Sequence, residues 1–118
     1  MLHQYFQKKA VAKYLKTLPS VLQADYGGGN YYSFGQINTV VSKCNLPIKH
    51  MKFAIAAFTN PSDIAGIFSK YFPTENGLAT RAQIADWFFD GDIEFVAKNS
   101  PLSKVGNSGN DSMPGGVQ

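Results

Sequence analysis

Apolar residues recur at intervals of three and four along most of the first 96 residues, which is the spacing of amphipathic helices. The pattern predicts helices over residues 2–16, 19–26, 34–45, 48–59 and 61–71, and a sixth that opens at Thr80 and stops at Gly91. Residues 93–96 alternate apolar and polar side chains, as a short extended segment or a last helical turn would. The expected fold is therefore all-α, a single compact domain of five or six short helices.

Local signals predict where these helices begin and end. Pro19 lacks an N–H and disfavours helical geometry at Leu18, so it is expected to end the first helix and to begin the second. Gly27 is expected to end that second helix in the left-handed conformation. The start signals of three later helices are Ser33 with Gln36, Asn60 with Pro61, and Thr80 with Gln83.

The segments 48–59 and 99–118 differ most in composition. The first is apolar nearly all round, so we expect a helix that is buried on most sides and forms the centre of the core. The second contains no aromatic residue and is rich in Gly, Ser and Asn, so it buries too little apolar area to offset its ordering entropy. The expected division is a helical domain over 1–97 and a flexible C-terminal tail over 98–118.

Composition sets the class of protein. With 118 residues, of which 44% are hydrophobic, the chain can form one modest core. Its single cysteine, Cys44, excludes an internal disulfide and fits a reducing compartment. Polar residues interrupt the apolar runs at the N-terminus, and the longest apolar stretch, 53–58, is too short for a membrane span. These features predict a soluble, cytoplasmic protein.

The charges are divided along the chain. Residues 1–52 hold seven lysines and one acid, Asp25, which gives a net charge of +6. Residues 53–118 hold four basic and seven acidic residues, which gives a net charge of −3. This division favours an anionic partner for the basic part, or self-association between the basic and acidic parts of two copies.

The candidate binding residues lie on the first helix. They are four lysines and two tyrosines: Lys8, Lys9, Lys13, Lys16, Tyr5 and Tyr14. The favoured hypothesis is a non-enzymatic interaction module that binds an acidic protein, or the acidic end of another copy, through this helix. The alternative is an RNA- or single-strand-binding accessory protein, with phosphates on the lysines and bases stacked on these tyrosines or on Tyr31 and Tyr32. An anionic membrane surface and an ordinary solvated helix face are further interpretations.

Three other features give weaker indications of a functional site. The helices at 34–45 and 48–59 are joined by a short break, as in a helix-turn-helix, but the second offers few outward polar side chains beyond Lys49, His50 and Lys52. Cys44 and His50 could form a thiolate–imidazole pair, although Cys44 lies on the apolar face of its helix. The third feature is an acidic cluster formed by Asp86, Asp90, Asp92 and Glu94.

The acidic cluster matches no calcium-loop spacing, so solvated acids near a helix end are the expected account and no metal site is predicted. No nucleophile motif is present, and neither histidine has a recognisable acidic partner in the sequence. We therefore expect neither an enzyme nor a cofactor.

Several segments resemble a known family: 8–14 with Leu18-Pro19, then Tyr26-Gly27, Gln36-Ile37, 50–58 and 89–92. Together they are similar to a family of small uncharacterised bacterial proteins, mostly from gammaproteobacteria, that is classed as a domain of unknown function. The resemblance covers roughly residues 5–95 and leaves out the tail. It implies a bacterial cytoplasmic protein and brings no activity or site residue.

Overall fold

The computed structural model describes residues 2–103, with side chains described from residue 4 onward. Within that range the chain forms five α-helices and one short 3₁₀ helix, and no strand. They are α1 (Leu2–Tyr26), α2 (Phe34–Lys43), α3 (Met51–Phe58), α4 (Pro61–Tyr71), α5 (Gly77–Phe88) and η1 (Ala97–Asn99). The prediction of an all-α fold is confirmed.

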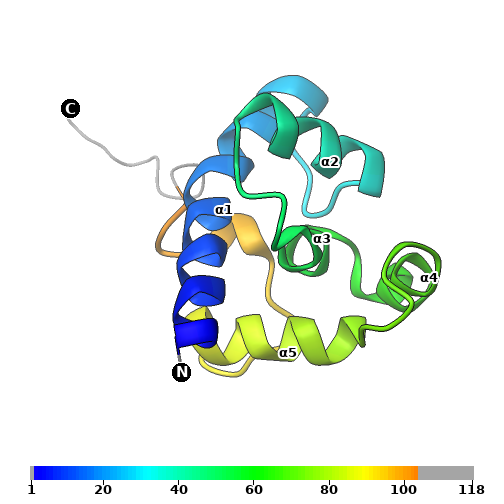
Figure 1. Cartoon of the computed structure of the whole chain (residues 1–118). Helices are drawn as coiled ribbons and strands as arrows, with labels where there is room; N and C mark the ends of the chain where they lie inside the picture. Colours follow the sequence, from blue (N-terminus) through cyan, green and yellow to red (C-terminus); the bar gives the residue numbers. More distant parts are fainter. Residues whose placement is uncertain (1, 104–118) are drawn as a thin grey trace.

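Helix α3 lies at the centre of the molecule. It packs against α1, α2, α4 and α5, which surround it in Figure 1. Every one of its residues except Lys52 is buried, because its sequence is apolar on all sides. The prediction of a central buried helix is confirmed, although the helix is shorter than the expected 48–59. Ile48 stays outside it and is 65% exposed.

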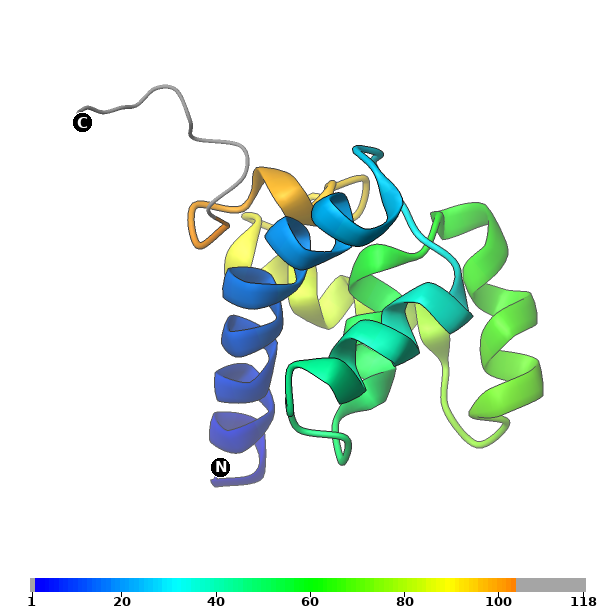
Figure 2. The same ribbon diagram turned by 90° about the horizontal axis from the view of Figure 1, so that it is seen from above.

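Helix α1 continues through Pro19, so the predicted break between residues 16 and 19 is wrong. Figure 2 shows the helix changing direction between its dark-blue N-terminal part and its lighter C-terminal part, as expected for an internal proline. Leu15, Leu18 and Leu22, on both sides of the proline, are completely buried on one face. Burial of about 1.5–3 kcal/mol per large apolar side chain offsets a proline penalty of about 3 kcal/mol.

The caps of the later helices are only partly as expected. Ser33 and Gln36 form the predicted capping box of α2, and the Asn60 side chain accepts a hydrogen bond from the Ser62 amide at the start of α4. The expected box at Thr80 is wrong, because α5 begins earlier, at Gly77. There the Asn76 side chain accepts from the Ala79 amide, while the Thr80 hydroxyl donates to the Asn76 carbonyl.

Gly77 allows α5 to begin directly against α4. A Cβ atom at this position would lie 2.8 Å from the Phe68 ring and would also overlap the Ile64 side chain. Carbon atoms do not approach so closely without displacing their neighbours. Glycine at position 77 is therefore what lets these two helices meet at the observed distance.

Arg81 closes the C-terminal end of α3. The last carbonyls of a helix have no partner within it, and here each of the last four has one. The Ile55 carbonyl accepts from the Thr59 amide, and the Phe58 carbonyl accepts from the Tyr32 amide at 2.8 Å. The carbonyls of Ala56 and Ala57 accept from Arg81 Nη1, at 3.0 and 3.5 Å.

The same guanidinium also holds the segment after α5. Arg81 Nε donates to the Ile93 carbonyl at 2.7 Å, Nη2 donates to the Phe95 carbonyl, and the group lies 3.8 Å from the centre of the Phe95 ring. Arg81 is only 2% exposed. Burial lowers its pKa from the ordinary value, and Tyr31, Glu94 and Asp92 partly oppose that shift. An arginine stays charged under such conditions, so its hydrogen bonds are charge-assisted.

The chain remains packed beyond residue 97, where the helical domain was expected to end. Ser100 and Ser103 are buried, and Leu102 packs against the core. The rest of the predicted tail, 104–118, lies outside the described residues.

Candidate functional site

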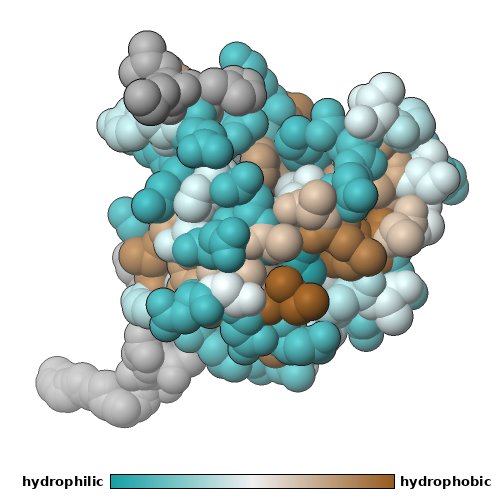
Figure 3. All heavy atoms as spheres, turned by 90° about the horizontal axis from the view of Figure 1, so that it is seen from below, coloured by the Kyte–Doolittle hydropathy of each residue, from teal (hydrophilic) through white to brown (hydrophobic). Residues whose placement is uncertain are grey.

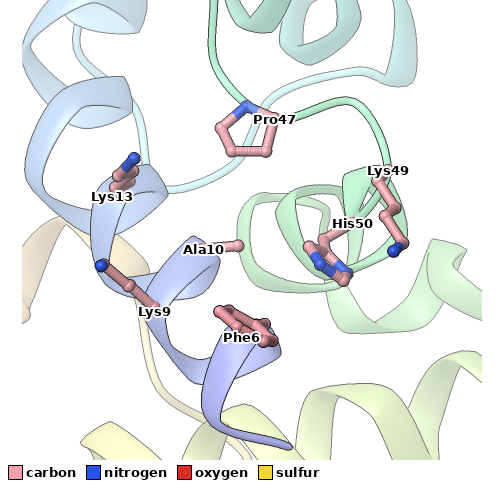
Figure 4. Close-up of a pocket in the computed structure, with 7 residues that line it drawn as sticks. All are labelled: Phe6, Lys9, Ala10, Lys13, Pro47, Lys49 and His50. Carbon is pink, nitrogen blue, oxygen red and sulfur yellow. The ribbon is translucent and has the colours of Figure 1, made fainter. Parts of the chain in front are cut away.

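A pocket of about 410 Å³ lies between the N-terminal half of α1 and the segment that leads from α2 into α3. Figure 4 shows Lys9 and Lys13 on one side of it, Lys49 and His50 on the other, and Phe6 between them in the lower part of the view. Its lining is completed by two apolar residues, and the full set is Phe6, Lys9, Ala10, Lys13, Pro47, Lys49 and His50.

Helical spacing brings the α1 side of the pocket together. Phe6, Lys9, Ala10 and Lys13 are spaced as i, i+3, i+4 and i+7, so all four lie on the same face of α1. Ala10 is buried at the base of this face, whereas Phe6 is 54% exposed. The helix therefore supplies both an apolar surface and two ammonium groups.

The opposite side of the pocket is fixed by the end of α2. Asn45 has a left-handed backbone (φ 55°), and the Leu46 amide donates to the Val41 carbonyl, so the chain turns sharply after Lys43. The Tyr14 hydroxyl then donates to the Pro47 carbonyl, which ties the connection to α1. Burial raises the pKa of this hydroxyl well above its ordinary value, so the hydroxyl is protonated and remains a donor at neutral pH.

Among the described residues, cations line the pocket and no carboxylate does. The side chains of Lys9, Lys13 and Lys49 are exposed at its rim. His50 is half-buried where α3 begins, and its ring centre lies 6.3 Å from that of Phe53. A cleft lined by charges of one sign concentrates the opposite charge from solution. This arrangement suits an anionic group that is attached to an apolar one, since Phe6, Ala10 and Pro47 lie between the cations.

The predicted lysines are all exposed, but they do not form one site. Lys9 and Lys13 line the pocket, whereas Lys16 does not. Lys8 points elsewhere, with its ammonium 5.9 Å from the centre of the Phe88 ring at the end of α5.

The two predicted tyrosines have different outcomes. Tyr5 is 56% exposed, and its ring lies edge-on to that of Phe6, with 5.3 Å between the ring centres. The Lys9 ammonium lies 5.9 Å from the centre of the Tyr5 ring. Tyr14 is completely buried and has no surface to offer a partner, so its assignment as a partner-binding residue is corrected. Its large apolar ring belongs to the core face of α1, and its hydroxyl holds a wall of the pocket instead.

Sequence reasoning missed Phe6 and Pro47, and it placed Lys49 and His50 in another context. The spacing of Phe6 from Ala10 and Lys13 is a visible signal for the α1 half of the pocket. The other half depends on how the α2–α3 connection folds back onto α1, which no local pattern indicates. The helix-turn-helix interpretation has no support, because α3 is buried and has no outward face for reading bases.

The other candidate groups do not converge on a site. Among residues 4–103, no group of three or more His, Cys, Asp and Glu side chains could hold a metal ion. Cys44 is half-buried against the core and does not line the pocket that contains His50. The two ion pairs in this part of the chain join Lys43 to Asp25 at 2.8 Å and Lys52 to Glu75 at 2.7 Å. The hydrogen bond and charge of Asp25 raise the pKa of Lys43.

Apolar surface alone does not distinguish the pocket. Large exposed apolar side chains are spread over the described chain, and they are Tyr5, Phe6, Tyr26, Ile48, Tyr71, Leu78 and Ile93. The face seen from below in Figure 3 also shows apolar residues among hydrophilic ones. The pocket differs because lysines and a histidine surround its apolar residues.

The structure thus defines a small all-α protein with a basic, partly apolar pocket beside its first helix. A family model, the family of unknown function DUF6559, matches residues 2–117, so the chain belongs to that family. The match extends beyond the 5–95 expected from sequence resemblance. No curated protein and no solved structure matches the chain. None of the helices in the described range has the length and apolar character needed to cross a membrane.

Proposed function

We propose that this protein is a non-enzymatic interaction module that binds an acidic segment of a partner protein in the pocket beside α1. The observation that carries this proposal is the convergence of Lys9, Lys13, Lys49 and His50 from two elements around an apolar base, with no carboxylate among the described residues that line it.

The chemistry of the pocket favours a peptide over a free anion. A bare anion would be held by flexible, exposed lysines, and each such ion pair contributes only about 0.2–1 kcal/mol. Phe6 adds apolar area that a neighbouring side chain of the partner can cover, at about 25 cal/mol per Å². A carboxylate next to a large apolar side chain uses both parts of the site.

The alternative partner is RNA or single-stranded nucleic acid. The exposed pair Tyr5 and Phe6, next to Lys9, supplies a surface on which a base could stack while the lysines contact phosphates. The burial of Tyr14 weakens this alternative, as do the half-buried positions of Tyr31 and Tyr32. The Tyr32 hydroxyl is also engaged, because it donates to the Gly27 carbonyl at 2.9 Å.

Reversing two pocket charges, Lys9→Glu with Lys13→Glu, is expected to weaken binding of an acidic probe at least about tenfold, which corresponds to about 1.4 kcal/mol. The probe is a short fluorescein-labelled peptide of alternating glutamate and leucine, and its anisotropy reports binding. The melting temperature should change little, because both lysines are exposed and form no ion pair with a described acid.

The matched control is Lys16→Glu with Lys70→Glu, which changes the net charge equally but leaves the pocket intact. We expect the control to bind within about threefold of the natural protein at about 0.15 M salt, where distant charges are screened. Equal losses in the two variants would show that net charge, not the pocket, binds the probe. Tighter binding of a labelled single-stranded RNA of matching length would favour the nucleic-acid alternative.

A further inference from the structure

The acidic turn after α5, formed by Asp92, Ile93 and Glu94, is held in one shape by the core. The left-handed backbones of Asp90 (φ 54°) and Gly91 (φ 81°) turn the chain away from α5. The Glu94 amide donates to Asp92 Oδ1 at 2.9 Å, and Arg81 Nε donates to the Ile93 carbonyl at 2.7 Å. The backbone of the turn is therefore ordered before any partner arrives, which lowers the entropic cost of binding.

The side chains of this turn point to solvent. Ile93 is 54% exposed although it is a large apolar residue, and carboxylates flank it on both sides. Within the described residues, Asp92 and Glu94 form no ion pair, since the ion pairs there use Asp25 and Glu75. The turn thus presents an apolar side chain between two exposed acids, whose charges act on the buried Arg81 but form no ion pair among the described residues.

These features complement the pocket beside α1. The pocket offers an apolar base between cations, and the turn offers an apolar tip between anions. We propose that the acidic partner is a second copy of this chain, whose 92–94 turn binds in the pocket with Ile93 against Phe6 and its carboxylates toward Lys9, Lys13 and Lys49. This inference rests on the proposed function, because it names the occupant of the same pocket.

The contact joins two different surfaces of the protein. A single contact of this kind generates a chain of molecules, whereas two reciprocal contacts close a dimer with two-fold symmetry. Either interface is small and rich in exposed charge, so we expect weak association, with a dissociation constant on the order of 0.1 mM. Association should also decrease as salt increases, because the charges are screened.

Sedimentation velocity over a concentration series tests the inference. At about 0.05 M salt we expect the sedimentation coefficient to rise with concentration, and at about 0.5 M salt we expect the monomer alone. Ile93→Ser should remove the low-salt association, because it removes the apolar tip but keeps the backbone carbonyl that Arg81 binds. Leu78→Ser is the matched control, since Leu78 is also 54% exposed, and it should associate like the natural protein.

Mixing two variants that each fail to self-associate gives a second, independent readout. The Lys9→Glu, Lys13→Glu variant keeps the turn, and the Ile93→Ser variant keeps the pocket, so a mixture should associate where each alone does not. A natural protein that stays monomeric at about 1 mM and low salt would overturn the inference, as would unchanged association of Ile93→Ser. If the natural protein is monomeric but still binds the glutamate–leucine peptide through Lys9 and Lys13, the inference of self-association is contradicted and the proposed function stands. If it does not bind the peptide either, the proposed function fails as well.

Discussion

Replacing Arg81 with methionine is expected to lower the free energy of unfolding by about 3–5 kcal/mol, because a buried hydrogen-bonding cation would be removed from its partners. The methionine fills much of the volume but donates no hydrogen bond. The carbonyls of Ala56 and Phe95 would then stay buried without their present donor, at about 1–3 kcal/mol for each, and the part-buried Ile93 carbonyl would lose its donor as well. The stacking on the Phe95 ring would also be lost. Urea unfolding measures the change.

Arg81→Lys is the informative companion to that variant. It keeps a positive charge near the end of α3, but a single ammonium cannot reproduce the planar fork that reaches both α3 and the 93–95 segment. We expect a loss smaller than that of Arg81→Met but still above about 1 kcal/mol. If Arg81→Met costs less than about 1 kcal/mol, this guanidinium does not hold the two segments together.

Phe58→Ala is expected to cost about 3–5 kcal/mol, which is the usual loss when a buried phenylalanine is truncated in a packed core. Phe58 is 1% exposed and lies at the end of α3, and every other α-helix of the described chain contacts this helix. The deletion removes apolar contacts and leaves a cavity that the surrounding helices cannot fill completely.

Phe6→Ala provides the matched aromatic control, because Phe6 is 54% exposed at the surface of α1. Its removal should cost under about 1 kcal/mol, since little of its contact area is in the core. Urea unfolding of the two variants compares them directly. A loss of less than about 1 kcal/mol for Phe58→Ala would contradict the central position of α3.

Features that depend on neighbouring residues in the chain were predictable from the sequence. The Ser33–Gln36 capping box, the Asn60 cap and the left-handed Gly27 each act within a few residues, so the local pattern contains all the information they need. The burial of α3 was predictable because its composition is apolar on every face.

Features that depend on packing were not predictable in the same way. Pro19 is a strong local stop signal, but the leucines on both sides of it share one buried face, and burial outweighs the signal. Asn76 begins α5 in place of Thr80 because Gly77 fits against Phe68 of another helix. Arg81 reads as an ordinary surface charge in sequence, and only the fold brings four carbonyls to it.

The candidate site combines features that were predictable from the sequence with features that were not. The lysines of α1 and their spacing were visible in the sequence, and their exposure agrees with that expectation. The pocket also needs Pro47, Lys49 and His50, which reach α1 through a long-range contact between Tyr14 and the Pro47 carbonyl. Tyr14 itself cannot serve a partner, because its ring is buried in the core.

The central claim is that an acidic protein segment binds in the pocket beside α1, and amide chemical-shift mapping with the glutamate–leucine peptide tests it most directly. We expect the largest salt-sensitive shifts at Lys9, Ala10, Lys13, Lys49 and His50, because these residues line the pocket from both sides. Shifts that are absent at saturating peptide, or that centre on residues away from α1 and the 47–50 segment, would contradict the claim.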